Sequence, residues 1–148
     1  MSHVADVLRA KGRAVVLTVP PDAEVARVAQ RMRQEQVGAF VVSPDGRRCD
    51  GIITERDIVN GIARSGPACL EQRVSALMSP AVHTCHRDDS VRSVMRTMTD
   101  ARVRHLPVIE RDELCGMISI GDVIKTFVDD ADLEHSVTRD AYLAQRSR

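Results

Sequence analysis

Apolar residues follow two kinds of spacing along the chain, and each change of spacing predicts a new element. Apolar residues three and four positions apart are typical of amphipathic helices, whereas short runs rich in Val and Ile are typical of buried strands. The first half predicts a short helix, a strand, a helix, two strands and a helix, at residues 4–11, 14–19, 25–32, 39–42, 51–53 and 57–63. The second half predicts the same order at residues 74–78, 82–85, 91–98, 106–109, 115–120 and 123–128. Asp22 is the expected N-cap of the helix that follows it.

The two halves also share identical residues at matching positions. The matched pairs are Thr18/Thr84, Asp22/Asp88, Val25/Val91, Val28/Val94, Met32/Met98, Val37/Val103, Val42/Val108, Gly51/Gly116, Ile53/Ile118 and Asp57/Asp122. Because a repeat determines the architecture, it has to be recognised before any other interpretation. Two similar units predict a pseudo-two-fold axis and therefore two similar clefts.

Each repeat has about 60 residues, a size at which the fraction of surface buried on folding is marginal, so we expect the halves to pack on each other. We divide the chain into a first unit at 4–63, a linker at 64–73, a second unit at 74–128 and a charged tail at 129–148 that can be helical. Alternating strands and helices predict the α/β (α+β) class. Within each unit, the two strands joined by a short turn are expected to be antiparallel neighbours. The first strand is expected to lie parallel beside one of them.

Composition excludes several kinds of partner. The 21 basic and 21 acidic residues balance, which argues against non-specific binding to nucleic acid or to a membrane surface. An aromatic content of 2% leaves few side chains for stacking on bases. No apolar run approaches a membrane span, and the N-terminus lacks a signal pattern, so we expect a cytoplasmic protein. The four cysteines (Cys49, Cys69, Cys85 and Cys115) lack Cys-x-x-Cys spacing and are expected to be free thiols.

Two strings carry the candidate binding chemistry, one from Gly51 to Asp57 and the other from Gly116 to Asp122. In each, a buried strand enters a helix through Thr or Ser, and Asp follows three residues later. A helix N-terminus can bind phosphate, and a carboxylate can accept hydrogen bonds from both vicinal hydroxyls of a ribose. The same spacing also forms a capping box, which requires no ligand. The two interpretations remain open at this point.

The sequence offers little for catalysis or metal binding. Strand alternation places His83 and Cys85 on one face and His86 on the other, whereas structural zinc requires four converging ligands. The chain contains no nucleophile elbow, no phosphate-loop lysine string and no dinucleotide-binding glycine motif. We therefore expect no metal, no catalytic residue and no required cofactor, and a protein that is not an enzyme.

The longer motifs resemble those of a known family. They are Leu17-Thr18-Val19, His83-Thr84-Cys85, Val37-Gly38-Ala39-Phe40-Val41-Val42, Val103-Arg104-His105-Leu106-Pro107-Val108 and the two Gly-x-x-Thr/Ser-x-x-Asp strings. With these motifs the chain resembles a tandem pair of CBS domains, the regulatory module first recognised in cystathionine β-synthase. It is similar to stand-alone bacterial proteins with two such domains, and the resemblance covers about residues 4 to 128.

The resemblance implies a βαββα fold for each unit, two sheets packed face to face, and a homodimer. It implies that AMP, ADP, ATP, S-adenosylmethionine or NAD(H) binds between the units, AMP being favoured. The first site, which we name the Asp57 cleft, would use Thr84, Val103, Arg104, His105, Ile52, Thr54, Arg56 and Asp57. The second, the Asp122 cleft, would use Thr18, Val37, Gly38, Ala39, Met117, Ser119 and Asp122.

The two clefts are expected to differ in charge. Arg56, Arg104 and His105 favour phosphate in the Asp57 cleft, whereas the matching positions of the Asp122 cleft are Gly121, Gly38 and Ala39. The Asp122 cleft is therefore expected to be less cationic, and to be weak, empty or bound to a different adenosyl ligand. We expect a non-catalytic regulatory module that signals energy or redox state to an unknown effector protein. The alternative is a constitutive dimerisation or interaction protein with no physiological ligand.

Overall fold

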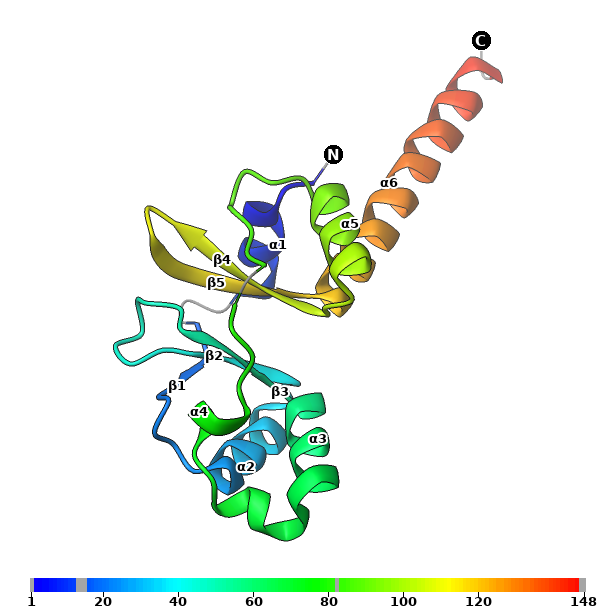
Figure 1. Cartoon of the computed structure of the whole chain (residues 1–148). Coiled ribbons are helices and arrows are strands. Elements are labelled where there is room, and N and C mark those ends of the chain that lie inside the picture. The colour runs from blue at the N-terminus through cyan, green and yellow to red at the C-terminus, as the bar shows by residue number, and fades with distance from the viewer. Residues whose placement is uncertain (1, 13–15, 82, 147–148) are drawn as a thin grey trace.

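The computed structural model describes residues 2–12, 16–81 and 83–146 (Figure 1). Its elements, in chain order, are α1 (Val4–Lys11), β1 (Thr18–Val19), α2 (Val25–Glu35), β2 (Ala39–Val42), β3 (Gly51–Thr54), α3 (Glu55–Ser65), the 3₁₀ helix η1 (Gly66–Glu71), α4 (Val74–Leu77), α5 (Val91–Ala101), β4 (His105–Glu110), β5 (Glu113–Ser119) and α6 (Ile120–Arg146). The mixed helix and strand order confirms the predicted fold class.

Strand pairing within the units follows the expected pattern. In the first sheet β1 pairs with β2 in parallel, and β2 pairs with β3 antiparallel. In the second sheet β4 and β5 are antiparallel. Among the described residues, the first strand of the second unit contributes one isolated parallel bridge, between Cys85 and Val108. Residues 14, 15 and 82, which the predicted first strands included, lie outside the described residues.

The two sheets face each other between the helices of the two units (Figure 1). Successive side chains of a strand point to opposite faces, so a strand covered on one side alternates between buried and exposed. All four residues of β2 are instead buried, because helices cover one face of the sheet and the second unit covers the other. A hydrogen bond from the Leu114 amide to the Arg47 carbonyl joins the two units at 2.8 Å.

The short helices that precede each unit cross to the other unit. Val4 and Val7 of α1 belong to the core of the second unit, and Val74 belongs to that of the first. The crossing is symmetric in its hydrogen bonds. The Val4 amide donates to the Asp89 carbonyl at 2.9 Å, and the Val74 amide donates to the Ala23 carbonyl at 2.8 Å. The core of the second unit is therefore completed by a segment from the start of the chain, whereas that of the first unit is completed by the segment that follows η1.

Glu24, not Asp22, is the N-cap of α2. The Asp22 assignment was wrong because α2 begins only at Val25, so that Asp22 lies too early in the chain to cap it. Glu24 pairs with Arg73 in an isolated bridge, and the Val25 amide donates to the Gln72 carbonyl at 2.9 Å. A free first-turn N–H of the helix is thus satisfied by backbone from another segment.

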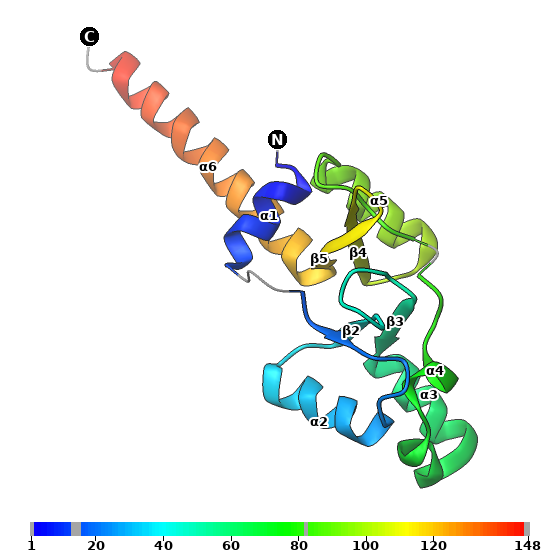
Figure 2. The same ribbon diagram turned by 90° about the vertical axis from the view of Figure 1, so that its left-hand side faces the viewer.

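The linker and the tail are both helical. The predicted linker is occupied by the end of α3 and by η1, whose Cys69 is fully buried. The tail continues α6 without a break to Arg146 and projects from the body (Figure 2). Near its base, the Ser2 hydroxyl donates to the Asp130 carboxylate at 2.9 Å. Among the described helices, none is long and apolar enough to cross a membrane.

Candidate functional site

Two cavities lie between the units, and each contains one of the two predicted aspartates. The Asp57 cleft has a volume of about 770 Å³ and the Asp122 cleft a volume of about 690 Å³. Both volumes fall within the usual range for small-molecule sites. Gly38, His105 and Ser119 line both cavities, so the two clefts adjoin at the pseudo-two-fold axis.

The structure brings together nearly all the residues predicted for the Asp57 cleft. The predicted residues that line it are Ile52, Thr54, Arg56, Asp57, Val103, Arg104 and His105. Thr84 does not line the cavity; its side chain is exposed just before the Cys85 bridge, and His83 lines the cavity instead. The prediction missed Ser79, Pro80 and Ala81, which follow α4. These three come from a crossing segment, whose destination no local pattern in the sequence specifies.

The Asp122 cleft shows the same agreement and the same kind of omission. The predicted residues that line it are Val37, Gly38, Ala39, Met117, Ser119 and Asp122. Thr18 does not line the cavity because it pairs with Val41 inside the sheet, and its carbonyl accepts a hydrogen bond from Arg31. Val16 and Leu17 line the cleft in its place. The prediction missed the residues of α1 on the cavity wall, including Arg9 and Lys11.

Both aspartates close a capping box, so this interpretation of the motif is correct as far as it goes. The Thr54 amide donates to Asp57 Oδ2 at 2.9 Å, and the Asp57 amide donates to Thr54 Oγ at 3.2 Å. Ser119 and Asp122 form the same pair of bonds, at 2.8 and 3.2 Å. The cap uses one carboxylate oxygen of each aspartate, and both carboxylates also lie on the cavity wall. Capping and ligand binding are therefore compatible at these positions.

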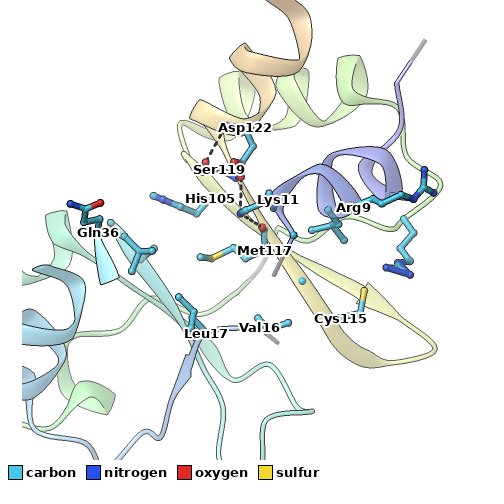
Figure 3. A pocket seen from close by; sticks show the side chains of 18 residues that line it. Arg9, Lys11, Val16, Leu17, Gln36, His105, Cys115, Met117, Ser119 and Asp122 are labelled. Atoms are coloured by element: carbon cyan, nitrogen blue, oxygen red, sulfur yellow. Dashed lines mark hydrogen bonds and ion pairs between the residues drawn. The ribbon is translucent and has the colours of Figure 1, made fainter. Parts of the chain in front are cut away.

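The second partner of each aspartate differs between the clefts. In the Asp57 cleft the Ser79 hydroxyl donates to Asp57 Oδ1 at 3.2 Å, and the Ser79 amide donates to the Ile52 carbonyl at 2.9 Å. In the Asp122 cleft the Lys11 ammonium donates to Asp122 Oδ2 at 2.9 Å and to the Met117 carbonyl at 3.0 Å (Figure 3). A neutral donor thus contacts one aspartate and a cation contacts the other, on different carboxylate oxygens.

The expectation that the Asp122 cleft is the less cationic one is wrong. Arg9, Lys11 and Arg87 all line it. These positions lie outside the motifs on which the expectation was based. Arg87 Nε is buried and has no hydrogen-bond partner among the described residues, since Glu110 Oε2 lies 3.8 Å away. The cleft therefore offers cationic donors that its own motif does not contain.

His105 lies between the clefts, where several charges act on it. Burial lowers the pKa of its imidazole below the ordinary value. Asp122 and Glu55 oppose this shift, whereas Lys11 and Arg104 reinforce it. Neutral imidazole is therefore favoured near pH 7, and a bound anion at the axis would favour the protonated form.

Two residues at the cleft edges have left-handed backbone conformations. Gln36 ends α2 with φ 54° and lines the Asp122 cleft, and Arg102 ends α5 with φ 55° and lines the Asp57 cleft. Both amides donate back to their helices, to the carbonyls of Met32 and Met98. These turns direct the chain from each helix into the strand entry that lines a cleft.

The histidines and cysteines of the second unit do not converge. His86 Nδ1 lies 2.8 Å from the Ile109 carbonyl oxygen, His83 lines the Asp57 cleft, and Cys85 is in the core. The described residues contain no group of three His, Cys, Asp or Glu side chains that could hold a metal ion. All four cysteines are free thiols, as predicted, and burial raises the pKa of Cys85 to about 12.

The repeat, the crossed helices and the two adjoining clefts define a class of paired domains, and comparison with known proteins identifies the family. Residues 4–64 and 74–129 each match the CBS domain, so the chain belongs to the CBS-domain family. It is 35% identical to the mitochondrial CBS domain-containing protein CBSX3 of Arabidopsis thaliana, over 84% of this chain and 64% of that protein. The chain thus spans slightly less than two thirds of that relative.

Solved structures share the same arrangement. The CBS-domain containing protein ATU1752 from Agrobacterium tumefaciens is 42% identical, with a TM-score of 0.79 over 84% of this chain and 98% of that one. More distant CBS structures contain ligands. PAE2072 from Pyrobaculum aerophilum, 22% identical with a TM-score of 0.72 over 82% and 89% of the two chains, is complexed with AMP. The domain pair of MJ0100, 19% identical with a TM-score of 0.77 over 88% and 98%, is complexed with 5′-methylthioadenosine and S-adenosyl-L-methionine. These distant likenesses show the fold alone.

Proposed function

We propose that this protein is a non-catalytic regulatory module that binds adenosine-containing nucleotides in the Asp57 and Asp122 clefts and passes their presence to an effector protein. One observation carries the proposal: two equivalent carboxylates, each fixed by a helix cap, lie in two cavities between the repeats. The ligands of PAE2072 and MJ0100 share an adenosyl group, which supports the same ligand class for this fold.

In the Asp57 cleft the carboxylate supplies the ribose-binding group. Asp57 Oδ2 is held by the Thr54 amide and hydroxyl, which orient the carboxylate. Asp57 Oδ1 accepts one long hydrogen bond from a neutral hydroxyl. A ribose hydroxyl can replace that donor without changing the charge of the site, so the exchange requires little free energy.

Phosphate recognition in this cleft would come from the arginines. Arg56, Arg102 and Arg104 line the cavity together with the N-terminus of α3, which begins at Glu55. Guanidinium groups and helix N-termini both favour phosphate. The cavity walls that remain, including Ile52 and Val103, are aliphatic and suit a purine read by backbone groups.

Replacing each aspartate tests the proposal. Asp57→Ala and Asp122→Ala should each weaken nucleotide binding by about 1–3 kcal/mol, the loss expected for a charge-assisted bond. Isothermal titration calorimetry with AMP, ATP, NADH and S-adenosylmethionine measures this. Each variant should also lose about 1 kcal/mol of stability with its cap.

Ser90→Ala is the matched control, because the Ser90 side chain caps α5 by accepting from the Ser93 amide. It lies outside both clefts and should lower stability by a similar amount while leaving nucleotide affinity unchanged. If the aspartate variants lower stability as Ser90→Ala does and leave every affinity unchanged, the aspartates are caps alone and the proposal fails.

A constitutive dimerisation protein is the second candidate, and the exposed apolar residues of the two helices that follow the motifs favour it. Val59 of α3 and Ile124 of α6 occupy matching positions and are 62% and 54% exposed. Ile62 and Val128 extend the same apolar surfaces. We propose that these exposed apolar residues of α3 and α6 join two copies of the chain. We also propose that the protein is cytoplasmic, as its free thiols suggest. A homodimer that binds none of the four nucleotides would favour this second function.

A further inference from the structure

Lys11 and Ser79 satisfy the same two acceptors in the two clefts, although they belong to different crossing segments. One acceptor is a carbonyl on the strand that precedes the motif, at Ile52 or at the matching Met117. The other is the carboxylate of the motif aspartate, at Oδ1 of Asp57 for Ser79 and at Oδ2 of Asp122, the capping oxygen, for Lys11. Ser79 uses its peptide N–H and its hydroxyl, whereas Lys11 uses one ammonium for both.

The donor of each cleft determines how easily its aspartate can exchange partners. Asp57 Oδ1 would give up a neutral hydroxyl at 3.2 Å, and a ribose hydroxyl is an equivalent replacement. A ribose whose two hydroxyls use both oxygens of Asp122 would instead compete with an ammonium at 2.9 Å on Oδ2. A charge-assisted hydrogen bond is roughly twice as strong as a neutral one. When the ribose hydroxyls of an uncharged ligand replace Lys11, weaker hydrogen bonds replace a stronger one, and the binding free energy becomes less favourable.

Burial makes this difference larger than on an open surface. The side chains of Lys11 and Asp122 are 30% and 20% exposed, so water screens their ion pair only in part. Arg9 and Arg87 line the same cavity, and their acidic partners, Asp6 at 3.3 Å and Glu110 at 3.8 Å, lie outside its lining, so basic side chains outnumber carboxylates on the cavity wall. A phosphate group on the ligand would reverse both effects, because it offers the ammonium an anionic partner and neutralises its neighbours.

We propose that Lys11 is a specificity-determining residue of the Asp122 cleft. Its ion pair with Asp122 opposes the binding of uncharged adenosyl ligands, whereas a phosphorylated ligand can bind Asp122 because its phosphate forms a new ion pair with the Lys11 ammonium. This inference rests on the proposed function, since it requires an adenosyl ligand held by Asp122. It makes the Asp122 cleft selective for phosphorylated ligands through α1, a segment outside the repeated motif.

The two clefts can be followed separately in one sample. Met117 lines only the Asp122 cleft, and Ile52, its counterpart, lines only the Asp57 cleft. Carbon-13 labelling of the Met and Ile methyl groups therefore gives each cleft a reporter in the nuclear magnetic resonance spectrum. AMP and adenosine are titrated into the wild-type protein, Lys11→Met and Lys11→Arg.

For the wild type, the Met117 methyl should report AMP binding about tenfold tighter than adenosine binding, as expected for one partly buried charged contact. Lys11→Met keeps the length of the side chain and should reduce that ratio to about threefold or less, through tighter adenosine binding and weaker AMP binding. Lys11→Arg keeps the charge and should preserve the preference. The ratio at the Ile52 methyl should be the same in all three proteins.

An unchanged ratio at Met117 in Lys11→Met overturns the proposal. If the Ile52 methyl responds and Met117 responds in none of the three proteins, the Lys11 proposal is overturned while nucleotide binding at the Asp57 cleft stands. If neither methyl responds to AMP, ATP, NADH or S-adenosylmethionine, the proposed function itself fails, and the specificity role fails with it.

Discussion

The Asp57 and Asp122 clefts share a motif but not the segment that closes them. Their strands, caps and aspartates correspond, and the same pairs of capping bonds recur within 0.1 Å. The closing helices differ, because α1 has 8 residues and α4 has 4. The longer helix places Lys11 on Asp122, where the shorter one places Ser79 on Asp57. A repeated scaffold can thus carry two chemically different sites when the flanking segments differ.

The largest expected difference between the two units lies at Gly51 and its counterpart Gly116. A Cβ atom on Gly51 would lie 2.5 Å from the Ser79 carbonyl oxygen, which belongs to the backbone. On Gly116 it would lie 2.8 Å from Leu8 Cδ2, the end of a flexible side chain. Gly51→Ala should therefore cost about 2–3 kcal/mol of stability and Gly116→Ala about 1 kcal/mol. Urea unfolding of the two variants measures both values, and equal losses would contradict the comparison.

Arg104 should raise the affinity of the Asp57 cleft for phosphate relative to the Asp122 cleft, and the effect should be of intermediate size. It lines the Asp57 cleft, whereas its counterpart Gly38 has no side chain. Arg104→Ala should weaken AMP binding at the Asp57 cleft about tenfold and leave adenosine binding unchanged, because only the phosphate contact is lost. Calorimetry with both ligands measures the effect. Arg92→Ala removes the same charge from an exposed position outside both cavities and is the control. A tenfold loss for adenosine as well would mean that Arg104 does not act on phosphate.

The position of His105 between the clefts should appear in the pH dependence of stability. Burial, the largest effect, lowers its pKa in the folded protein. As the pH falls through about 6.5, the ordinary value, the unfolded chain therefore binds the proton before the folded one does. Stability from this group is fully present above about pH 6.5 and is lost as the pH falls further. His105→Gln should flatten the stability profile between about pH 7 and 5. A slope that persists in this variant would assign the effect to other groups.

The smallest expected effect compares the two cores. Val19 and Cys85 occupy matching positions and are 2% and 3% exposed. Cys85→Val gives the second core the residue of the first, with a similar volume, and should change stability by less than about 1 kcal/mol. Only a weak contact from the Cys85 thiol to the Pro107 carbonyl, at 3.8 Å, is lost. Thermal unfolding measures the change, and a loss of several kcal/mol would show that the two cores are packed differently.

Local patterns predicted what depends on neighbours in the sequence. The strand and helix order and the two aspartates with their caps all follow from short-range spacing. The predictions that failed involve contacts between distant segments. The local pattern places the N-cap of α2 at Asp22, whereas the helix begins after Glu24, where the backbone contacts Gln72 and Arg73. Thr18 lies in the sheet, as its predicted strand requires, but Leu17 and not Thr18 lines the cleft.

The sequence by itself determined that the chain has two similar units, each with one aspartate after a buried strand, since a repeat and its spacing are visible without coordinates. Only the tertiary structure decided which core each lead-in helix joins, because Val4 and Val74 carry similar apolar patterns and either core could bury them. That choice brings Lys11 to Asp122, more than one hundred residues away along the chain. The charge of this cleft depends on residues that are distant in the sequence and are brought together by packing, so no local sequence pattern predicts it.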